Sequence, residues 1–224
     1  MTNIQRTFPL MFKALKNIFK PDDKRRALEF WTWFFANEMH YRDMAEDGLK
    51  EQEHRIKIFL DHLAKYDYEL TFVTGKHADG TYELIISADG IQKHFTSVET
   101  LVSAAPALKD WRFIALKQPQ PEIGPVVLND KTFSIEDLQF ARVNNPDDPN
   151  EMNVVIFHPT YMEEEQELHV VATYLLLDGL LGERAVAEDI NGLDIQPLKD
   201  EVPANVLRPL QALPLVIAEH NRAN

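Results

Sequence analysis

Residues 78–119 constrain the fold more than any other stretch of the chain. They contain the tripeptide Ala-Asp-Gly twice, at 78–80 and 88–90, on either side of the strand-like run 81–87. Asp-Gly supplies the positive φ that a tight hairpin turn requires, so the first tripeptide predicts a β-hairpin. Within the run, apolar residues alternate with a more mixed set, which is typical of a strand with one buried face.

A helix and a third strand complete this block. Thr96 and Glu99 have the spacing of a capping box, in which the hydroxyl and the carboxylate each accept a backbone N–H of the first turn. Pro106 ends the apolar helix that follows, and residues 111–116 alternate again as a strand. The block therefore predicts a hairpin, a helix and a further strand.

The rest of the chain adds helices before this block and strands after it. Spacings of three and four predict helices over 24–43 and 49–66. Further elements are predicted as strands over 70–74, 126–128, 138–143, 153–157 and 190–195, and as a deeply buried helix over 161–181 that opens with a second capping box at Thr160 and Glu163. No internal repeat is visible beyond the two tripeptides.

This order of elements favours an α+β fold. Helices and strands are segregated rather than strictly alternating, which predicts N-terminal helices and a mostly antiparallel sheet with helices packed on one face. We assign residues 1–21 to an amphipathic N-terminal helix and residues 22–224 to a single α+β domain.

Composition excludes several kinds of site. The chain has 224 residues, no cysteine and a net charge of −13. The lack of cysteine excludes disulfides, thiolate metal sites and a cysteine nucleophile. The negative charge opposes nucleic-acid binding. No apolar run reaches the length of a bilayer span, so the sequence predicts no transmembrane segment. The lack of cysteine is compatible with the cytosol, and we expect a cytoplasmic protein.

The N-terminal segment differs in charge from the rest of the chain. Residues 1–26 carry seven basic and two acidic side chains, and apolar residues recur every three or four positions between Phe8 and Phe19. Two interpretations stay open. The segment docks on its own domain, which we favour, or it binds a membrane surface or a partner as a basic amphipathic helix.

An aromatic run marks the first predicted helix of the domain. Phe30, Trp31, Trp33 and Phe34 lie on more than one face of that helix. A helix that is apolar on several faces is buried on several sides or forms an interface. Core packing is the simpler interpretation. The alternative is that these four residues bind a protein partner or a second copy of the chain, because aromatic side chains are frequent interface anchors.

The sequence contains no established catalytic or cofactor motif, so we expect no cofactor. Weak catalytic candidates are His158, at the end of a predicted strand, His169, and Asp178, a carboxylate inside an apolar helix. Asp178 has a structural interpretation as well, as a carboxylate with a fixed partner. Glu165 and His169 lie four apart on one helix face and are weak candidates for a metal pair, but no further ligands are evident and we expect no metal.

Three segments resemble a family of uncharacterised bacterial proteins. They are Glu-Leu-Ile-Ile-Ser-Ala-Asp-Gly at 83–90 with its continuation to Phe113, Leu-Asp-Gly-Leu-Leu-Gly-Glu at 177–183, and the aromatic residues 30–34. The resemblance touches most of the chain from about residue 28 to residue 198. It implies a soluble bacterial protein and carries no activity across.

These observations favour a non-catalytic protein-interaction or binding module. The lack of a recognisable catalytic constellation supports this hypothesis, and the acidic net charge would steer the chain toward a basic partner. One alternative is a hydrolase-type enzyme of unrecognised class with its site near His158, His169 and Asp178. The other is a peripheral membrane or scaffold protein that attaches through the basic N-terminus.

Overall fold

The computed structural model describes residues 21–199 and 202–223, which form two compact units. Unit 1 contains the described residues up to Asp89 and Lys93–Leu116, and unit 2 contains Gly90–Gln92 and the described residues from Lys117 onward. The predicted α+β class is confirmed. Each unit has a buried core, where the sequence predicts one domain over 22–224. The helix predicted over 1–21 lies outside the described residues, apart from Pro21.

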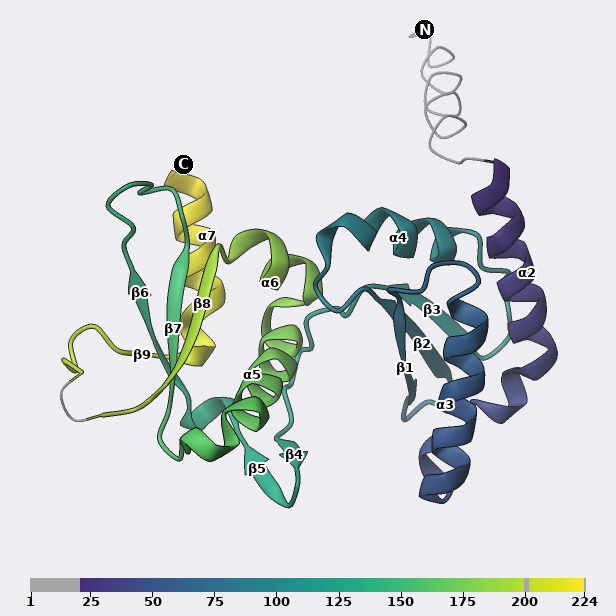
Figure 1. Ribbon diagram of the computed structural model, residues 1–224, viewed down its shortest axis with the longest axis horizontal. Coiled ribbons are helices and arrows are strands. Elements are labelled where there is room, and N and C mark those ends of the chain that lie inside the picture. Colours follow the sequence, from purple (N-terminus) through teal and green to yellow (C-terminus); the bar gives the residue numbers. More distant parts are fainter. Residues whose placement is uncertain (1–20, 200–201, 224) are drawn as a thin grey trace, which may run out of the picture. The chain divides into compact units, whose positions relative to one another are not determined.

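Unit 1 opens with two helices (Figure 1). α2 (Pro21–Asn37) and α3 (Leu49–Leu63) are joined by the 3₁₀ turns η1 (Glu38–His40) and η2 (Met44–Glu46). The helix predicted over 24–43 thus ends early. Asn37 Nδ2 donates to Trp33 O at 2.7 Å and satisfies a carbonyl of the last turn.

The sheet of unit 1 has the order β1-β2-β3. β1 (Thr71–Lys76) and β2 (Tyr82–Ser87) form the predicted antiparallel hairpin, with Gly80 at φ +81° in its turn. β3 (Trp111–Ala115) pairs with β2 in parallel. A parallel pair needs a crossover connection, which here contains η3 (Gln92–His94) and α4 (Phe95–Ser103).

The core of unit 1 lies between its helices and one face of this sheet. Phe72 stacks on Phe59 of α3 with ring centroids 3.7 Å apart, and Phe113 of β3 lies 4.6 Å from the ring of Trp31. Phe72 is opposite Ile86 and Phe113 is in register with Leu84, and both partners are fully buried. Side chains of residues in register share a face, so α2 and α3 cover the same face.

Phe30, Trp31 and Phe34 therefore belong to the core of unit 1, where the sequence allowed a partner surface. All three are buried, and their rings pack on Phe59, Trp111 and Phe113. Trp31 Nε1 donates to Leu101 O at 2.8 Å, so its buried N–H is satisfied. Trp33 is half-buried and stacks on His62, with ring centroids 4.1 Å apart.

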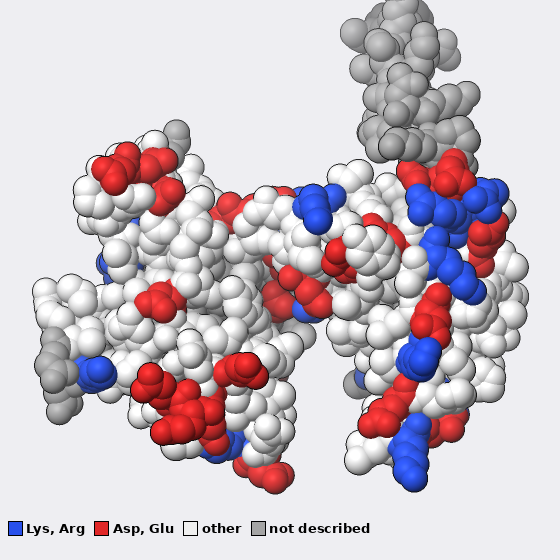
Figure 2. Space-filling view, viewed as in Figure 1, with Lys and Arg blue, Asp and Glu red and all other residues white. Residues whose placement is uncertain are grey.

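The outer surface of α2 and α3 carries charges of both signs. Figure 2 shows acidic and basic side chains interspersed along these helices. Arg25 pairs with Glu29 and Lys57 with Asp61, each at 2.6 Å. Exposed pairs of this kind contribute little to stability, so this surface is a solvated face.

None of the helices that the structure describes is long and apolar enough to cross a membrane.

Unit 2 contains a hairpin and a four-stranded sheet. β4 (Val126–Leu128) pairs with β5 (Lys131–Phe133), and the sheet has the order β8-β7-β6-β9. Its strands are β6 (Gln139–Val143), β7 (Asn153–His158), β8 (Gly192–Pro197) and β9 (Arg208–Pro209). The helical elements are η4 (Ile135–Asp137), η5 (Glu163–Glu165), α5 (Gln166–Leu181), α6 (Glu183–Asp189), η6 (Leu210–Ala212) and α7 (Leu213–Ala223).

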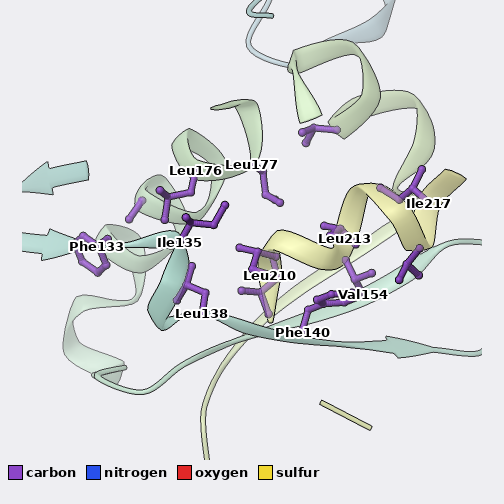
Figure 3. Close-up of a cluster of buried hydrophobic side chains, with 14 of the residues drawn as sticks. Phe133, Ile135, Leu138, Phe140, Val154, Leu176, Leu177, Leu210, Leu213 and Ile217 are labelled. Atoms are coloured by element: carbon purple, nitrogen blue, oxygen red, sulfur yellow. The ribbon is translucent and has the colours of Figure 1, made fainter. Parts of the chain in front are cut away.

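The core of unit 2 gathers side chains from β6, β7, α5 and α7 (Figure 3). Phe140 and Ile156, opposite each other on β6 and β7, are buried together with Leu176 of α5 and Leu213 of α7. α5 is less deeply buried than predicted. Val171, Tyr174 and Leu175 are between 41% and 48% exposed, so one side of this apolar helix is not covered by its own unit.

The two units repeat one order of elements. In unit 1 the antiparallel pair β1–β2 is followed by α4 and the parallel strand β3; in unit 2 the pair β6–β7 is followed by α5, α6 and the parallel strand β8. The sequence shows no repeat of comparable extent. The shared order follows from the same physical requirement, that a strand joining in parallel needs a crossover helix.

Neither predicted capping box forms at a helix N-terminus. α4 begins at Phe95, with His94 as its N-cap, so Thr96 already lies inside the helix. α5 begins at Gln166, after η5, and no side-chain cap is formed by Glu165. Near Thr160 the backbone N–H of Met162 donates to His169 Nε2 at 3.3 Å, so a side chain of α5 satisfies this N–H.

The junction between α5 and α6 requires a glycine. Gly182 has φ +81° and ψ 151°, a conformation that is essentially confined to glycine. A Cβ at this position would lie 2.8 Å from Pro119 Cδ and 3.1 Å from Pro119 N. The chain turns here from one helix into the next within a single residue.

We expect Gly182→Ala to lower the free energy of unfolding by about 2–3 kcal/mol, because it adds backbone strain and a contact with the backbone of Pro119. Urea denaturation measures this change. The control is Gly48→Ala, at a negative φ with no heavy atom within 4 Å of the added Cβ, where we expect a change within about 1 kcal/mol. Equal effects of the two substitutions would contradict the prediction.

Candidate functional site

The structure brings together two of the three predicted catalytic residues. His158 is the last residue of β7, and His169 lies in the first turn of α5, one turn before Thr173. His158 Nδ1 is 3.3 Å from His169 Nδ1, and His158 Nε2 is 2.7 Å from Thr173 Oγ1. The Thr173 hydroxyl donates to His169 O at 2.7 Å. We call His158, His169 and Thr173 the histidine cluster.

The hydrogen bonds of the histidine cluster run in one direction. The backbone N–H of Met162 can only donate, so His169 Nε2 accepts from it and the proton of a neutral ring sits on Nδ1. That Nδ1–H donates to His158 Nδ1, which leaves His158 Nε2–H to donate to the Thr173 hydroxyl oxygen. All four ring nitrogens are satisfied with both imidazoles neutral, and an added proton would place two donors face to face.

Burial favours the same neutral state. His158 and His169 are each 1% exposed. Burial, with a smaller contribution from the imidazole of His169, lowers the pKa of His158 to about 4. Burial also lowers the pKa of His169. The charge of Glu165 raises this pKa, and that of Lys131 lowers it. Phe133 lies edge-on to both rings, with ring centroids 6.0 and 5.3 Å away, so the cluster is enclosed by aromatic surface as well.

The histidine cluster is arranged as a structural contact that joins β7 to α5. Its ring nitrogens are all occupied by protein groups, and its side chains have almost no exposed surface. A general base or a nucleophile must reach a substrate with at least one of these atoms. The contacts therefore support a structural role, while the proposed catalytic role of His158 and His169 stays a prediction.

Asp178 lies apart from the histidine cluster. It is nine residues beyond His169 on α5, which places it on the opposite side of the helix. Its Oδ2 is 2.9 Å from Lys117 Nζ, and both side chains are largely buried. The carboxylate in the apolar helix is thus paired with a cation, in agreement with its structural interpretation.

The weak metal candidates are also engaged with protein groups. Glu165 forms an ion pair with Lys131, and both ring nitrogens of His169 have the partners described above. Within residues 21–199 and 202–223, no group of three His, Asp or Glu side chains is placed to hold a metal ion.

A site that the sequence did not predict lies in unit 2, at the end of α7. A cavity of about 440 Å³ opens there, which we call the arginine cavity. Its charged and polar lining comes from Arg142 of β6, Asn205, Arg208 of β9, and Glu219 and His220 of α7. Its apolar lining includes Phe140, Val206 and Val216. The volume lies within the range of small-ligand pockets.

Hydrogen bonds fix one side of the arginine cavity. Arg142 Nη2 is 2.9 Å from His220 Nδ1, and since a guanidinium can only donate, Nδ1 is the acceptor. His220 Nε2 then donates to Asn150 O at 2.8 Å. The imidazole thereby orients the Arg142 guanidinium. Among the described residues, no carboxylate lies within ion-pair distance of Arg208, and Arg208 is exposed.

Sequence reasoning missed this cavity because its residues come from three distant segments. β6, β9 and α7 bring together positions 142, 208 and 220, which share no motif. One signal was present. Leu138, Phe140 and Arg142 occupy alternate positions and so share a face, which makes Arg142 a cation on an otherwise apolar face.

The histidine cluster predicts an acid-sensitive step in stability. His158 takes up a proton near pH 6.5 in the unfolded chain but only near pH 4 in the folded one, so stability falls as the pH drops from 6.5 to 4. The loss is about 3 kcal/mol, since one pKa unit corresponds to about 1.4 kcal/mol. Urea denaturation of wild type and His158→Gln across this range measures it. A wild-type curve no steeper than that of the variant would contradict the prediction.

A second substitution tests the direction of the hydrogen bonds. Thr173→Val keeps the shape of the side chain but leaves the buried His158 Nε2–H without its acceptor, so we expect a loss of about 1–3 kcal/mol. Thr173→Ser retains the hydroxyl and is expected to lose about 1 kcal/mol, for the missing methyl group. Thermal unfolding at pH 7.5 compares the two variants. Equal stability of both would show that the hydroxyl is not needed.

Comparison with known proteins adds no functional information. The chain matches none of the protein-family models, curated proteins or solved structures with which it was compared. The resemblance to a bacterial family drawn from residues 83–90 and 177–183 stays a prediction.

Proposed function

We propose that this protein is a non-catalytic binding module and that the arginine cavity of unit 2 binds an acidic ligand. The observation that carries the proposal is that Arg142, Arg208 and His220 line one cavity together with apolar residues. Guanidinium groups hold carboxylates and phosphates through paired, charge-assisted hydrogen bonds. The apolar lining adds contact area that a bare anion site lacks.

The net charge of the chain does not oppose this assignment at short range. The chain carries −13, but charges are screened over about 8 Å at physiological ionic strength. The lining of the cavity contains two arginines and a single carboxylate, Glu219. The local field thus favours an anion, and the ligand has the opposite sign to the basic partner that net charge alone predicts.

The two alternative functions have weaker support. A hydrolase near His158, His169 and Asp178 would need these side chains to converge on a substrate, but two are enclosed and the third pairs with Lys117. Attachment to a membrane depends on residues 1–20, which lie outside the described residues. Oligomeric state and location in the cell are predictions from sequence.

Isothermal titration tests the proposal with citrate and a triglutamate peptide as anionic probes and spermidine as the cationic control. We expect at least one anionic probe to bind, more weakly at high salt, and Arg208→Gln to weaken it about tenfold. Arg112→Gln is the matched control, because Arg112 is an exposed strand arginine of unit 1. Absence of binding by both anions, or equal affinity of Arg208→Gln and wild type, would contradict the proposal.

A further inference from the structure

The edge of β6 beside the arginine cavity is only partly covered. β6 pairs with β7 along its whole length, from Gln139 opposite Phe157 to Val143 opposite Asn153. On its other side, β9 pairs only with Gln139 and Phe140. Before β9 the chain forms a turn, in which Val206 N donates to Pro203 O, and Val206 lines the arginine cavity without pairing with β6. Residues 141–143 therefore have no strand partner on that side within the described chain.

The backbone groups of Arg142 point toward this uncovered edge. Leu138 O accepts from Leu210 N on the β9 side of the strand. Backbone groups of alternate residues in a strand point the same way, so those of Phe140 and Arg142 also face the β9 side. Phe140 is covered by Arg208 there, but the N–H and C=O of Arg142 meet no ladder partner among the described residues. An edge of this kind is a template for another strand.

The two arginines lie on one face of the sheet beside that edge. Phe140 and Arg208 are directly opposite each other, so their side chains share a face, and Arg142 shares it as well, two positions further along. All three side chains line the arginine cavity. Arg142 and Arg208 are thus diagonal neighbours on adjacent strands, a spacing of about 7–8 Å.

We infer that the ligand of the arginine cavity is an extended acidic peptide of a partner protein, added as a short strand along the uncovered edge of β6. This inference rests on the proposed function and names its ligand. The peptide backbone pairs with the N–H and C=O of Arg142, beyond the point where β9 stops pairing with β6. The acidic side chain of the peptide residue opposite Arg142 lies on the cavity face and meets the guanidinium groups of Arg142 and Arg208.

Strand addition differs from charge attraction alone, because it requires that every second residue of the peptide faces β6. A fluorescein-labelled peptide with alternating glutamate and valine is the probe, and fluorescence polarisation measures its affinity for the full-length protein. Backbone N-methylation of one set of alternate residues removes the N–H groups that face β6, and we expect it to weaken binding at least about tenfold. Methylation of the other set faces solvent and should change the affinity less than about threefold.

Protein variants locate the site on the chain. Arg142→Gln and Arg208→Gln should each weaken the peptide about tenfold, while Arg112→Gln leaves its affinity unchanged. Hydrogen exchange gives a readout that does not depend on charge: exchange of the Arg142 amide should slow at least about tenfold on binding, because that N–H enters a ladder.

The outcomes separate this inference from the proposed function. If citrate binds through Arg208 but the peptide binds no tighter, or if both methylated sets bind alike, strand addition is overturned and the acidic-ligand site stands. If the peptide binds the arginine variants as tightly as wild type, the inferred location is overturned. If neither citrate nor any acidic peptide binds, the proposed function and the inference fail together.

Discussion

Parallel pairing of one central strand is the constraint on which each unit is built. β2 and β7 each accept an antiparallel neighbour from before them in the chain and a parallel neighbour from after them. Because the parallel neighbour must enter from the same end, the chain has to cross the sheet, and it does so as α4 or as α5 and α6. These crossovers contribute the buried residues Leu101 and Leu176 to the two cores. The order of elements is thus shared although the sequences differ.

The end of each central strand shows how the same position can be stabilised in two ways. Ser87 and His158 are the last residues of β2 and β7, and both are buried polar side chains. Ser87 Oγ exchanges hydrogen bonds with Asp89, two residues away, in a local turn. His158 is instead bound by Thr173 and His169, on the crossover helix. The contact between Ser87 and Asp89 is local, whereas the hydrogen bonds of His158 join β7 to the crossover helix α5.

Local patterns predicted the strands well and the helix starts poorly. Alternation placed β1, β2, β3, β6, β7 and β8 within a few residues, since burial of one face imposes a period of two, but β5 and β9 were not predicted. The capping boxes at Thr96 and Thr160 failed because backbone N–H groups near a helix start can be satisfied by any acceptor within reach. Near Thr160 that acceptor is His169 Nε2, which no local rule anticipates. No sequence pattern predicted the contact between His158 and His169, although both residues were catalytic candidates.

By itself, the sequence determined the α+β class, the hairpin at Asp79-Gly80 and the aromatic content of the first core. These properties depend on residues close together in the chain, through turn geometry and periodicity. Only the tertiary structure decided that Phe30, Trp31 and Phe34 are core residues, that Asp178 pairs with Lys117, and that Arg142 and Arg208 share a cavity. Each of those facts depends on which distant segments the sheet order brings together, and local spacing carries no information about that order.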